Sequence, residues 1–163
     1  DKVILPGVGA FGDAMNKIRE YRLENVIYDV VDSKKPFLGI CLGLQLLYKT
    51  SEESPGATGL GILDGDIVRI PESEGLKIPQ IGWNNLQIKK GAKLFSGIEG
   101  SPYVYFVHSY YLKSRDIEDV AATTHYSVDI HASVERENVF ACQFHPEKSS
   151  DVGLKILENF VKL

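Results

Sequence analysis

The stretch Gly39-Ile40-Cys41-Leu42-Gly43 contains the end of an apolar run at residues 37–40 and the start of a run with helical spacing at residues 42–48. This pattern is typical of a nucleophile on a sharp turn from a strand to a helix, where only glycines fit two positions to either side. The turn places the thiol at a helix N-terminus, whose dipole lowers a thiol pKa and favours the thiolate. We therefore expect Cys41 to be a nucleophile and the N–H of Leu42 to be free to bind an oxyanion.

The alternative for this stretch is a buried structural cysteine that has glycine neighbours by chance, and the strand–helix context counts against it. The second cysteine, Cys142, lies inside an apolar run with no such turn, so we expect it to be structural. Two cysteines do not make the disulfide framework of a secreted domain. We expect reduced thiols and a cytoplasmic protein.

Strands and helices alternate around this turn. Residues 2–5 predict a strand that ends in the glycine-rich turn Pro6-Gly7-Val8-Gly9. Apolar residues at helical spacing between positions 15 and 31 predict two short helices, the first capped by Asp13. Because strands that alternate with helices are usually joined by crossover connections, this half of the chain predicts a parallel sheet.

The second half of the chain is richer in strands. After a predicted loop at residues 51–61, a hairpin turn at Glu137-Asn138 indicates that part of this half is antiparallel. The last segment, residues 152–163, predicts an amphipathic helix that packs on the sheet. The strands are predicted at residues 66–70, 83–89, 103–112, 120–126, 130–135 and 139–144, and the buried side of the helix at Leu154, Ile156, Leu157, Phe160 and Val161.

A base for the nucleophile is found in Gln143-Phe144-His145-Pro146-Glu147. His145 ends an apolar strand, and in extended chain Glu147 faces the same way, so its carboxylate can orient the imidazole. The alternatives are a surface turn and a metal site, since zinc deaminases also contain His-x-Glu. Because no Cys-x-x-Cys or histidine cluster accompanies it, we expect no metal.

The other histidines have weaker signals. His108 lies among aromatic residues in Tyr105-Phe106-Val107-His108-Ser109-Tyr110, and we expect it to pack in the interior. His125 and His131 lie in predicted strands without acidic partners in register, and we expect no function for either.

The two motifs, with the first extended through Leu44 and Gln45, resemble the signatures of the class I (triad) glutamine amidotransferases and occur in the same order. In that family a Cys–His–Glu triad releases ammonia from glutamine through a γ-glutamyl thioester. The resemblance covers the whole chain. It implies that Cys41 is the nucleophile, His145 the general base and acid, and Glu147 the residue that orients His145. It also implies no cofactor and one domain, residues 1–163, with a three-layer, flavodoxin-like α/β fold in which helices flank a mixed central sheet beside a small antiparallel sheet.

A more specific resemblance is to the glutaminase subunits of imidazole glycerol phosphate synthase, a histidine-pathway enzyme. It implies L-glutamine as substrate and a heterodimer with the cyclase subunit that receives the ammonia. It also implies a further strand–helix unit before Asp1. The stretches that carry it are Leu5 to Met15, Ile78-Pro79-Gln80-Ile81-Gly82-Trp83-Asn84, residues 105–110, and His145-Pro146-Glu147-Lys148-Ser149.

The remaining site residues follow from this resemblance. Gly7, Val8 and Gly9 match the strand that completes the oxyanion site with Leu42. The positions that match contacts to glutamine are Gln45, Glu53, Ser109 and Tyr110, although Glu53 also fits a solvated loop. The positions that match the synthase interface are Trp83, Tyr105 and Lys148.

Charge and hydropathy limit the possible partners. The net charge of −4 argues against nucleic acid or an anionic membrane as the main partner. The longest apolar runs are too short to cross a bilayer.

Three other functions are compatible with a cysteine on such a turn. They are another class I amidotransferase, acting in guanylate, anthranilate or cytidine nucleotide synthesis, a DJ-1-like or protease-like domain, and a non-catalytic interaction module. The specific stretches count against the first, Gln45 and the His-Pro-Glu motif against the second, and the intact triad against the third.

Overall fold

The structure is a computed structural model that describes residues 1–163. It contains four α-helices, α1 (Phe11–Glu20), α2 (Leu23–Asp32), α3 (Leu42–Gln45) and α4 (Ser150–Lys162), and three 3₁₀ turns, η1 (Lys93–Phe95), η2 (Ile117–Asp119) and η3 (Pro146–Lys148). The strands are β1 (Val3–Gly7), β2 (Phe37–Cys41), β3 (Thr50–Ser51), β4 (Gly65–Arg69), β5 (Gln80–Asn85), β6 (Gln87–Ile88), β7 (Tyr103–His108), β8 (Tyr110–Ser114), β9 (Val120–Tyr126), β10 (Val128–Arg136) and β11 (Val139–Cys142).

The central sheet has six strands in the order β1-β2-β11-β10-β9-β6. Strands β1, β2 and β11 are parallel, and β10, β9 and β6 continue the sheet in antiparallel pairs, so the predicted mixed sheet is confirmed. The predicted turn Glu137-Asn138 joins β10 to β11. Because β2 and β11 run in the same direction, Cys41 at the end of β2 and His145, which follows β11, lie at the same end of the parallel strands.

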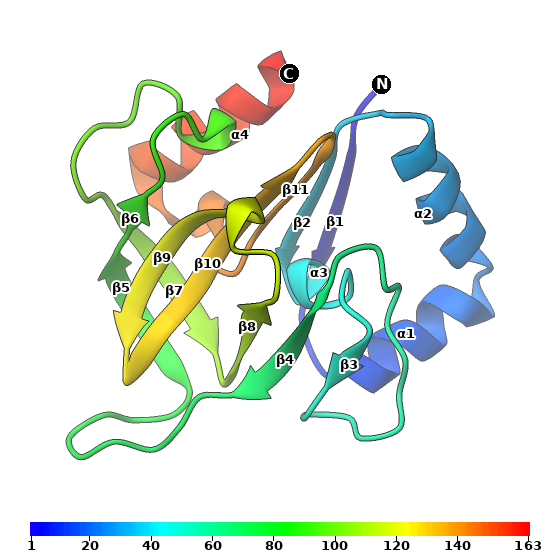
Figure 1. Cartoon of the computed structure of the whole chain (residues 1–163), viewed down its shortest axis with the longest axis horizontal. Helices are drawn as coiled ribbons and strands as arrows, with labels where there is room; N and C mark the ends of the chain where they lie inside the picture. The colour runs from blue at the N-terminus through cyan, green and yellow to red at the C-terminus, as the bar shows by residue number, and fades with distance from the viewer.

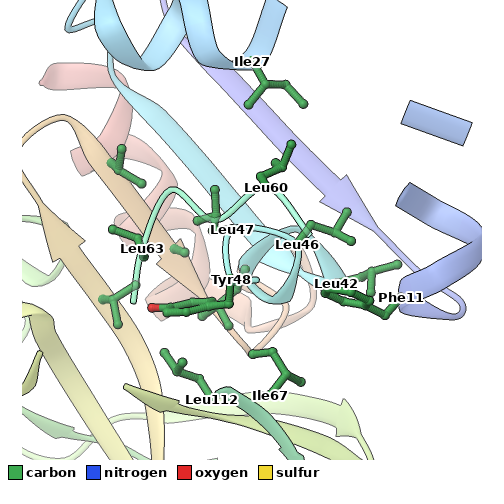
Figure 2. Close-up of a cluster of buried hydrophobic side chains, with 14 of the residues drawn as sticks. Phe11, Ile27, Leu42, Leu46, Leu47, Tyr48, Leu60, Leu63, Ile67 and Leu112 are labelled. Atoms are coloured by element: carbon green, nitrogen blue, oxygen red, sulfur yellow. The ribbon is translucent and has the colours of Figure 1, made fainter. Parts of the chain in front are cut away.

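Helices cover both faces of this sheet, which gives the three predicted layers (Figure 1). Neighbouring residues of a strand face opposite sides. Phe37 of β2 packs in a cluster with Phe11 of α1 and Ile27 of α2, and Figure 2 shows part of that cluster. Leu38 packs in a second cluster with Phe160 of α4. The molecule therefore has two large apolar cores, one on each side of the sheet.

Two predicted strands are each divided between sheets. The segment predicted at residues 83–89 forms β5, which pairs with β7 in a two-stranded sheet, and β6, which joins the central sheet. The segment at residues 103–112 divides at Ser109. Before it, β7 pairs with β5; after it, β8 pairs with β4 in a three-stranded sheet that also contains β3. Ser109 accepts a backbone hydrogen bond from Ile70 at this point.

Helix α3 is shorter than the predicted helix at residues 42–48. It ends at Gln45, and the carbonyl oxygens of the next two residues accept hydrogen bonds from a neighbouring loop. The N–H of Leu60 donates to Leu46 O, and the N–H of Ile62 donates to Leu47 O. Both leucines are nevertheless buried, as Figure 2 shows, so burial on all sides produced the apolar pattern that resembled a helix.

The first and last helices also differ in detail from the prediction. Asp13 does not cap α1; the helix begins at Phe11, whose N–H donates to the carboxylate of Glu53 at 2.8 Å. In α4, Ile156 and Phe160 are buried as predicted, but Leu154 and Val161 are 62% and 66% exposed.

The rotation of α4 has a steric cause. A side chain at Gly153 would lie 1.8 Å from the carbonyl oxygen of Pro146. The side of α4 that carries Gly153 therefore packs against the rest of the protein. Asn159, on the same side, donates from its amide to the backbone oxygens of Leu94 and Ser96, both at 2.8 Å. No helix of the structure combines the length and the apolarity that crossing a membrane requires.

Candidate active site

Cys41 occupies the strand-to-helix turn that the sequence predicts. It is the last residue of β2 and precedes α3, with φ 55° and ψ −109°, a region that non-glycine residues rarely adopt. A side chain at Gly43 would lie 1.8 Å from the carbonyl oxygen of Leu5, and one at Gly39 would lie 2.7 Å from Gly43 O. The turn is therefore tight enough to require both glycines, and its strained backbone presents the sulfur at the edge of the sheet.

The predicted lowering of the Cys41 pKa is wrong. Burial raises the pKa of the Cys41 thiol to about 11, although hydrogen bonds from the Leu42 N–H and the Gln143 side chain lower it. Helix α3 has only four residues, so its dipole is small beside the cost of desolvating a thiolate. The resting site therefore holds a neutral thiol, and a base must remove its proton.

His145 has the geometry of that base. Its Nδ1 lies 2.7 Å from Glu147 Oε1, and a carboxylate only accepts hydrogen bonds, so Nδ1 carries the proton. The other ring nitrogen, Nε2, is buried and has no partner in the structure. In neutral His145 it is unprotonated, which leaves it able to accept a proton.

The contact between His145 and Glu147 is the predicted one, but its geometry is not. Residues 146–148 form the 3₁₀ turn η3 rather than extended chain, with Pro146 as its first residue. The turn brings the carboxylate back to the imidazole, and Glu147 remains about half exposed while His145 is buried.

A cavity of about 230 Å³ joins most of the predicted site residues. This volume is below the roughly 300–1,000 Å³ typical of sites for drug-sized ligands, so it suits a molecule of amino-acid size. The cavity lies between the end of β1, the Cys41 turn, the β7–β8 connection and His145. Its lining residues are Val8, Gly9, Cys41, Leu42, Gln45, Glu53, Val107, His108, Ser109, Tyr110 and His145.

Gly7 does not line this cavity. It packs against the side chain of Leu42, and a Cβ added at Gly7 would lie 3.1 Å from Leu42 Cβ. Gln45 uses its amide nitrogen to hold Tyr110 O and Gln143 Oε1, both at 3.0 Å, which leaves its oxygen for a ligand. Glu53 has a structural contact as well, because it accepts the first N–H of α1.

A larger cavity of about 700 Å³ lies elsewhere, beside the η1 turn and the end of α4. It is lined by exposed lysines, including Lys90 and Lys93, and by no cysteine, histidine, aspartate or glutamate. Because it contains no cysteine and no histidine, the predicted cysteine–histidine chemistry could take place only in the smaller cavity.

Three residues of the site were not predicted to act there. Val107 and His108 line the cavity, and Gln143 contacts Cys41 Sγ through its Nε2 at 3.7 Å. His108 is buried as expected, with Nδ1 2.8 Å from Tyr110 O and Nε2 2.8 Å from the Gln80 side chain. Burial lowers the pKa of His108 to about 4, so it is neutral at physiological pH. The only sequence signal that placed Gln143 near the site was its position two residues before His145.

The expectation that His125 has no acidic partner in register is wrong. Asp129 lies directly opposite it in the β9–β10 pair, with 2.8 Å between Nδ1 and Oδ1. Both side chains are largely exposed, so the pair contributes little stability. His131 accepts a hydrogen bond from the N–H of Ser114 and lies outside the cavity.

The predicted interface residues lie outside the cavity. Trp83 is 53% exposed and packs edge-on against Tyr105, with 6.0 Å between the ring centroids. These two residues are paired across β5 and β7, and Ile81 and Tyr103 add further exposed apolar surface to the same ribbon. Lys148 is exposed on the η3 turn.

The fold, the strained cysteine turn and the histidine–carboxylate pair define a class. The family model for class-I glutamine amidotransferases matches residues 1–163, and the chain belongs to this family. Among its relatives is a protein of Methanocaldococcus jannaschii named imidazole glycerol phosphate synthase subunit HisH, which is 48% identical over 100% of this chain and 81% of its own length. The subunit of the same name from Cyanothece sp. is 52% identical over 99% of this chain and 77% of its own length.

Solved structures agree on the fold. The structure of PurLQS from Thermotoga maritima matches with a TM-score of 0.72 and 22% identity, over 99% of this chain and 82% of that one. A structure described as a glutamine amidotransferase matches with a TM-score of 0.70 and 23% identity, over 97% and 78% of the two chains. At these identities the likeness supports the three-layer α/β fold alone.

Proposed function

We propose that this chain is the glutaminase subunit of an imidazole glycerol phosphate synthase, which hydrolyses L-glutamine and passes ammonia to a cyclase subunit. The observation that carries the chemistry is the single small cavity in which Cys41 and the buried Nε2 of His145 meet Gln45, Ser109 and Tyr110. The relatives of the same name, at about half identity over nearly the whole chain, support the choice among amidotransferases.

The reaction begins with proton transfer from Cys41 Sγ to His145 Nε2. The sulfur attacks the side-chain amide carbon of glutamine, and the carbonyl oxygen becomes an oxyanion. The N–H of Leu42 and a backbone N–H of residues 7–9 stabilise that oxyanion. His145 then protonates the amide nitrogen, the C–N bond breaks, and ammonia leaves a γ-glutamyl thioester on Cys41.

Hydrolysis of the thioester completes the cycle. A water molecule gives a proton to His145 and attacks the thioester carbon, and the sulfur leaves as glutamate is released. His145 returns its proton to the thiol. Glu147 keeps the positive imidazolium stable at both stages, because its carboxylate accepts the Nδ1 hydrogen bond.

The glutamine contacts and the interface complete the proposal. Gln45, Glu53, Ser109 and Tyr110 line the same cavity as Cys41 and would bind the amine and carboxylate of the substrate. Exposed Trp83, Tyr105 and Lys148 would contact the cyclase subunit. Residues 1–163 would act as one catalytic domain in the cytoplasm.

Reconstitution with the cyclase subunit tests the proposal. Synthesis from glutamine should be lost in Cys41→Ser, whereas synthesis from added ammonium salt should survive, because the cyclase chemistry belongs to the other chain. Loss of both activities in an assembled complex, or retention of the glutamine-dependent one, would refute the division of labour.

A further inference from the structure

Two buried amide side chains connect the wall of the cavity to the sulfur of Cys41. Gln45 Nε2 donates to the backbone oxygen of Tyr110 and to Gln143 Oε1, at 3.0 Å each. Gln143 Nε2 in turn lies 3.7 Å from Cys41 Sγ, within range of a hydrogen bond to sulfur. Gln143 is fully buried and does not line the cavity, so it has no access to a substrate.

The direction of this hydrogen-bond chain is determined by its backbone end. A carbonyl oxygen only accepts, so Tyr110 O requires the NH₂ group of Gln45. The second hydrogen of that group requires the oxygen of Gln143, which leaves the NH₂ group of Gln143 facing the sulfur. If either amide were reversed, two donors or two acceptors would face each other.

This polarity matters for the chemistry of the sulfur. An N–H that faces sulfur stabilises the thiolate more than the thiol, and it cannot accept the thiol proton. The Gln143 and Leu42 N–H groups both lower the pKa of the Cys41 thiol, whereas burial raises it. The proton must therefore leave in another direction, and His145, which lines the cavity with Cys41 and has an unpartnered Nε2, is the proposed acceptor.

We propose that Gln143 is a positioning residue of the active site, whose N–H, oriented by Gln45 and Tyr110, binds the Cys41 sulfur and stabilises it as the thiolate. The inference rests on the proposed function of Cys41 as nucleophile. A purely structural buried amide would affect folding stability and leave the ionisation of the thiol unchanged.

The test is the pH dependence of Cys41 alkylation by iodoacetamide in Gln143→Met, followed by peptide mass mapping. Methionine has a similar length and no N–H. We expect alkylation about tenfold slower than in the wild type wherever the rate still rises with pH, the effect of losing one hydrogen bond to a charged group. Iodoacetamide requires no glutaminase activity, so failure of this test differs from failure of the proposed function. In the cyclase complex, kcat for glutamine should fall while KM stays unchanged.

Asn159→Leu is the matched control, because Asn159 is also a buried amide with hydrogen bonds to backbone oxygens, and it lies outside the cavity. It should lower the free energy of unfolding and leave the alkylation profile of Cys41 unchanged. A folded Gln143→Met protein with the wild-type profile, or an equal change in the control, would overturn the proposal.

A measurement on the wild-type chain covers the outcome in which Gln143→Met does not fold. In isotope-labelled protein, the side-chain N–H resonances of Gln143 should shift when Cys41 is alkylated, because alkylation changes the sulfur acceptor that this N–H faces. The side-chain resonances of Asn159 should not move. Unchanged Gln143 resonances would count against the hydrogen bond and the proposal.

Discussion

At the scale of single residues, burial keeps the proposed nucleophile, Cys41, in its neutral thiol form. Burial raises the pKa of the Cys41 thiol to about 11, and His145 Nε2 lies buried without a partner. The reactive thiolate is therefore a minor species at neutral pH. In the proposed mechanism, proton transfer to His145 is therefore part of the reaction with glutamine.

The alkylation rate of the wild-type chain should follow this pKa. Because the thiolate is the reactive form and its pKa is about 11, the rate should rise about tenfold per pH unit from neutral pH towards that value. Burial raises the pKa of Cys142 further, so peptide mapping should place the adduct on Cys41. A plateau at about pH 8, the range of an ordinary thiol, would contradict the raised pKa of Cys41. An adduct on Cys142 would contradict the assignment of Cys41 as the nucleophile.

Two substitutions separate the base from its orienting group. His145→Ala removes the proton acceptor and should lower glutamine turnover in the cyclase complex by about 100- to 10,000-fold. Glu147→Gln keeps a hydrogen-bond acceptor for Nδ1 on a half-exposed side chain and should cost less. Steady-state kinetics at saturating glutamine measures both. Near-wild-type turnover by His145→Ala would remove His145 from the mechanism.

Sequence patterns predicted Cys41, His145 and Glu147 and the contact between the last two. They did not predict the raised thiol pKa, since the burial of Cys41 depends on side chains from β7, β11 and α4 that pack around it. They also placed Glu147 in extended chain, although a 3₁₀ turn makes the contact. Gln143 was missed because an amide acquires its function here only through Gln45 and Tyr110.

At the scale of elements, the turn between β2 and α3 depends on close backbone approach. Gly43→Ala should lower the free energy of unfolding by more than about 3 kcal/mol, because overpacking that side chains can relieve costs about 1–3 kcal/mol and here the obstacle is the backbone oxygen of Leu5. Urea unfolding followed by circular dichroism measures the change.

Gly56→Ala is the control for the conformational effect of replacing a glycine. Gly56 has φ +85° and no atom within 4 Å of an added Cβ, so the substitution should cost only the roughly 1–2 kcal/mol of a left-handed residue. If Gly43→Ala were no more destabilising than Gly56→Ala, the tight turn described for Cys41 would be wrong.

Element boundaries were predictable where local chemistry sets them. The strand before Cys41, the two N-terminal helices and the turn at Glu137-Asn138 follow from apolar spacing and turn residues. The end of α3 and the rotation of α4 were not predictable. They depend on a loop that bonds to Leu46 and Leu47, and on the contact of Gly153 with Pro146 O, both of which are tertiary.

At the scale of the whole molecule, the parallel strands place Cys41 and His145 at one end of the central sheet. The β5–β7 ribbon contributes Val107 and His108 to the cavity and also carries the exposed Trp83–Tyr105 pair. If this ribbon docks the cyclase, Trp83→Ala should raise Kd by about 30-fold, or about 2 kcal/mol, as expected for a central aromatic contact. Calorimetric titration of the two subunits measures it.

Leu154→Ala is the matched control, since Leu154 is also an exposed apolar residue but lies on α4. It should leave Kd unchanged. Equal affinities for wild type and Trp83→Ala would place the interface elsewhere, and an equal loss in both variants would indicate a general effect on folding.

The proposed mechanism depends above all on the attack of Cys41 on glutamine in this cavity. Its most direct test is glutamate release from L-glutamine by the complex with the cyclase subunit and its substrate, combined with mass mapping of acid-quenched protein. We predict turnover by the wild type with a glutamyl adduct on the Cys41 peptide, and neither turnover nor adduct in Cys41→Ser. Glutamate release by Cys41→Ser at the wild-type rate would contradict the account.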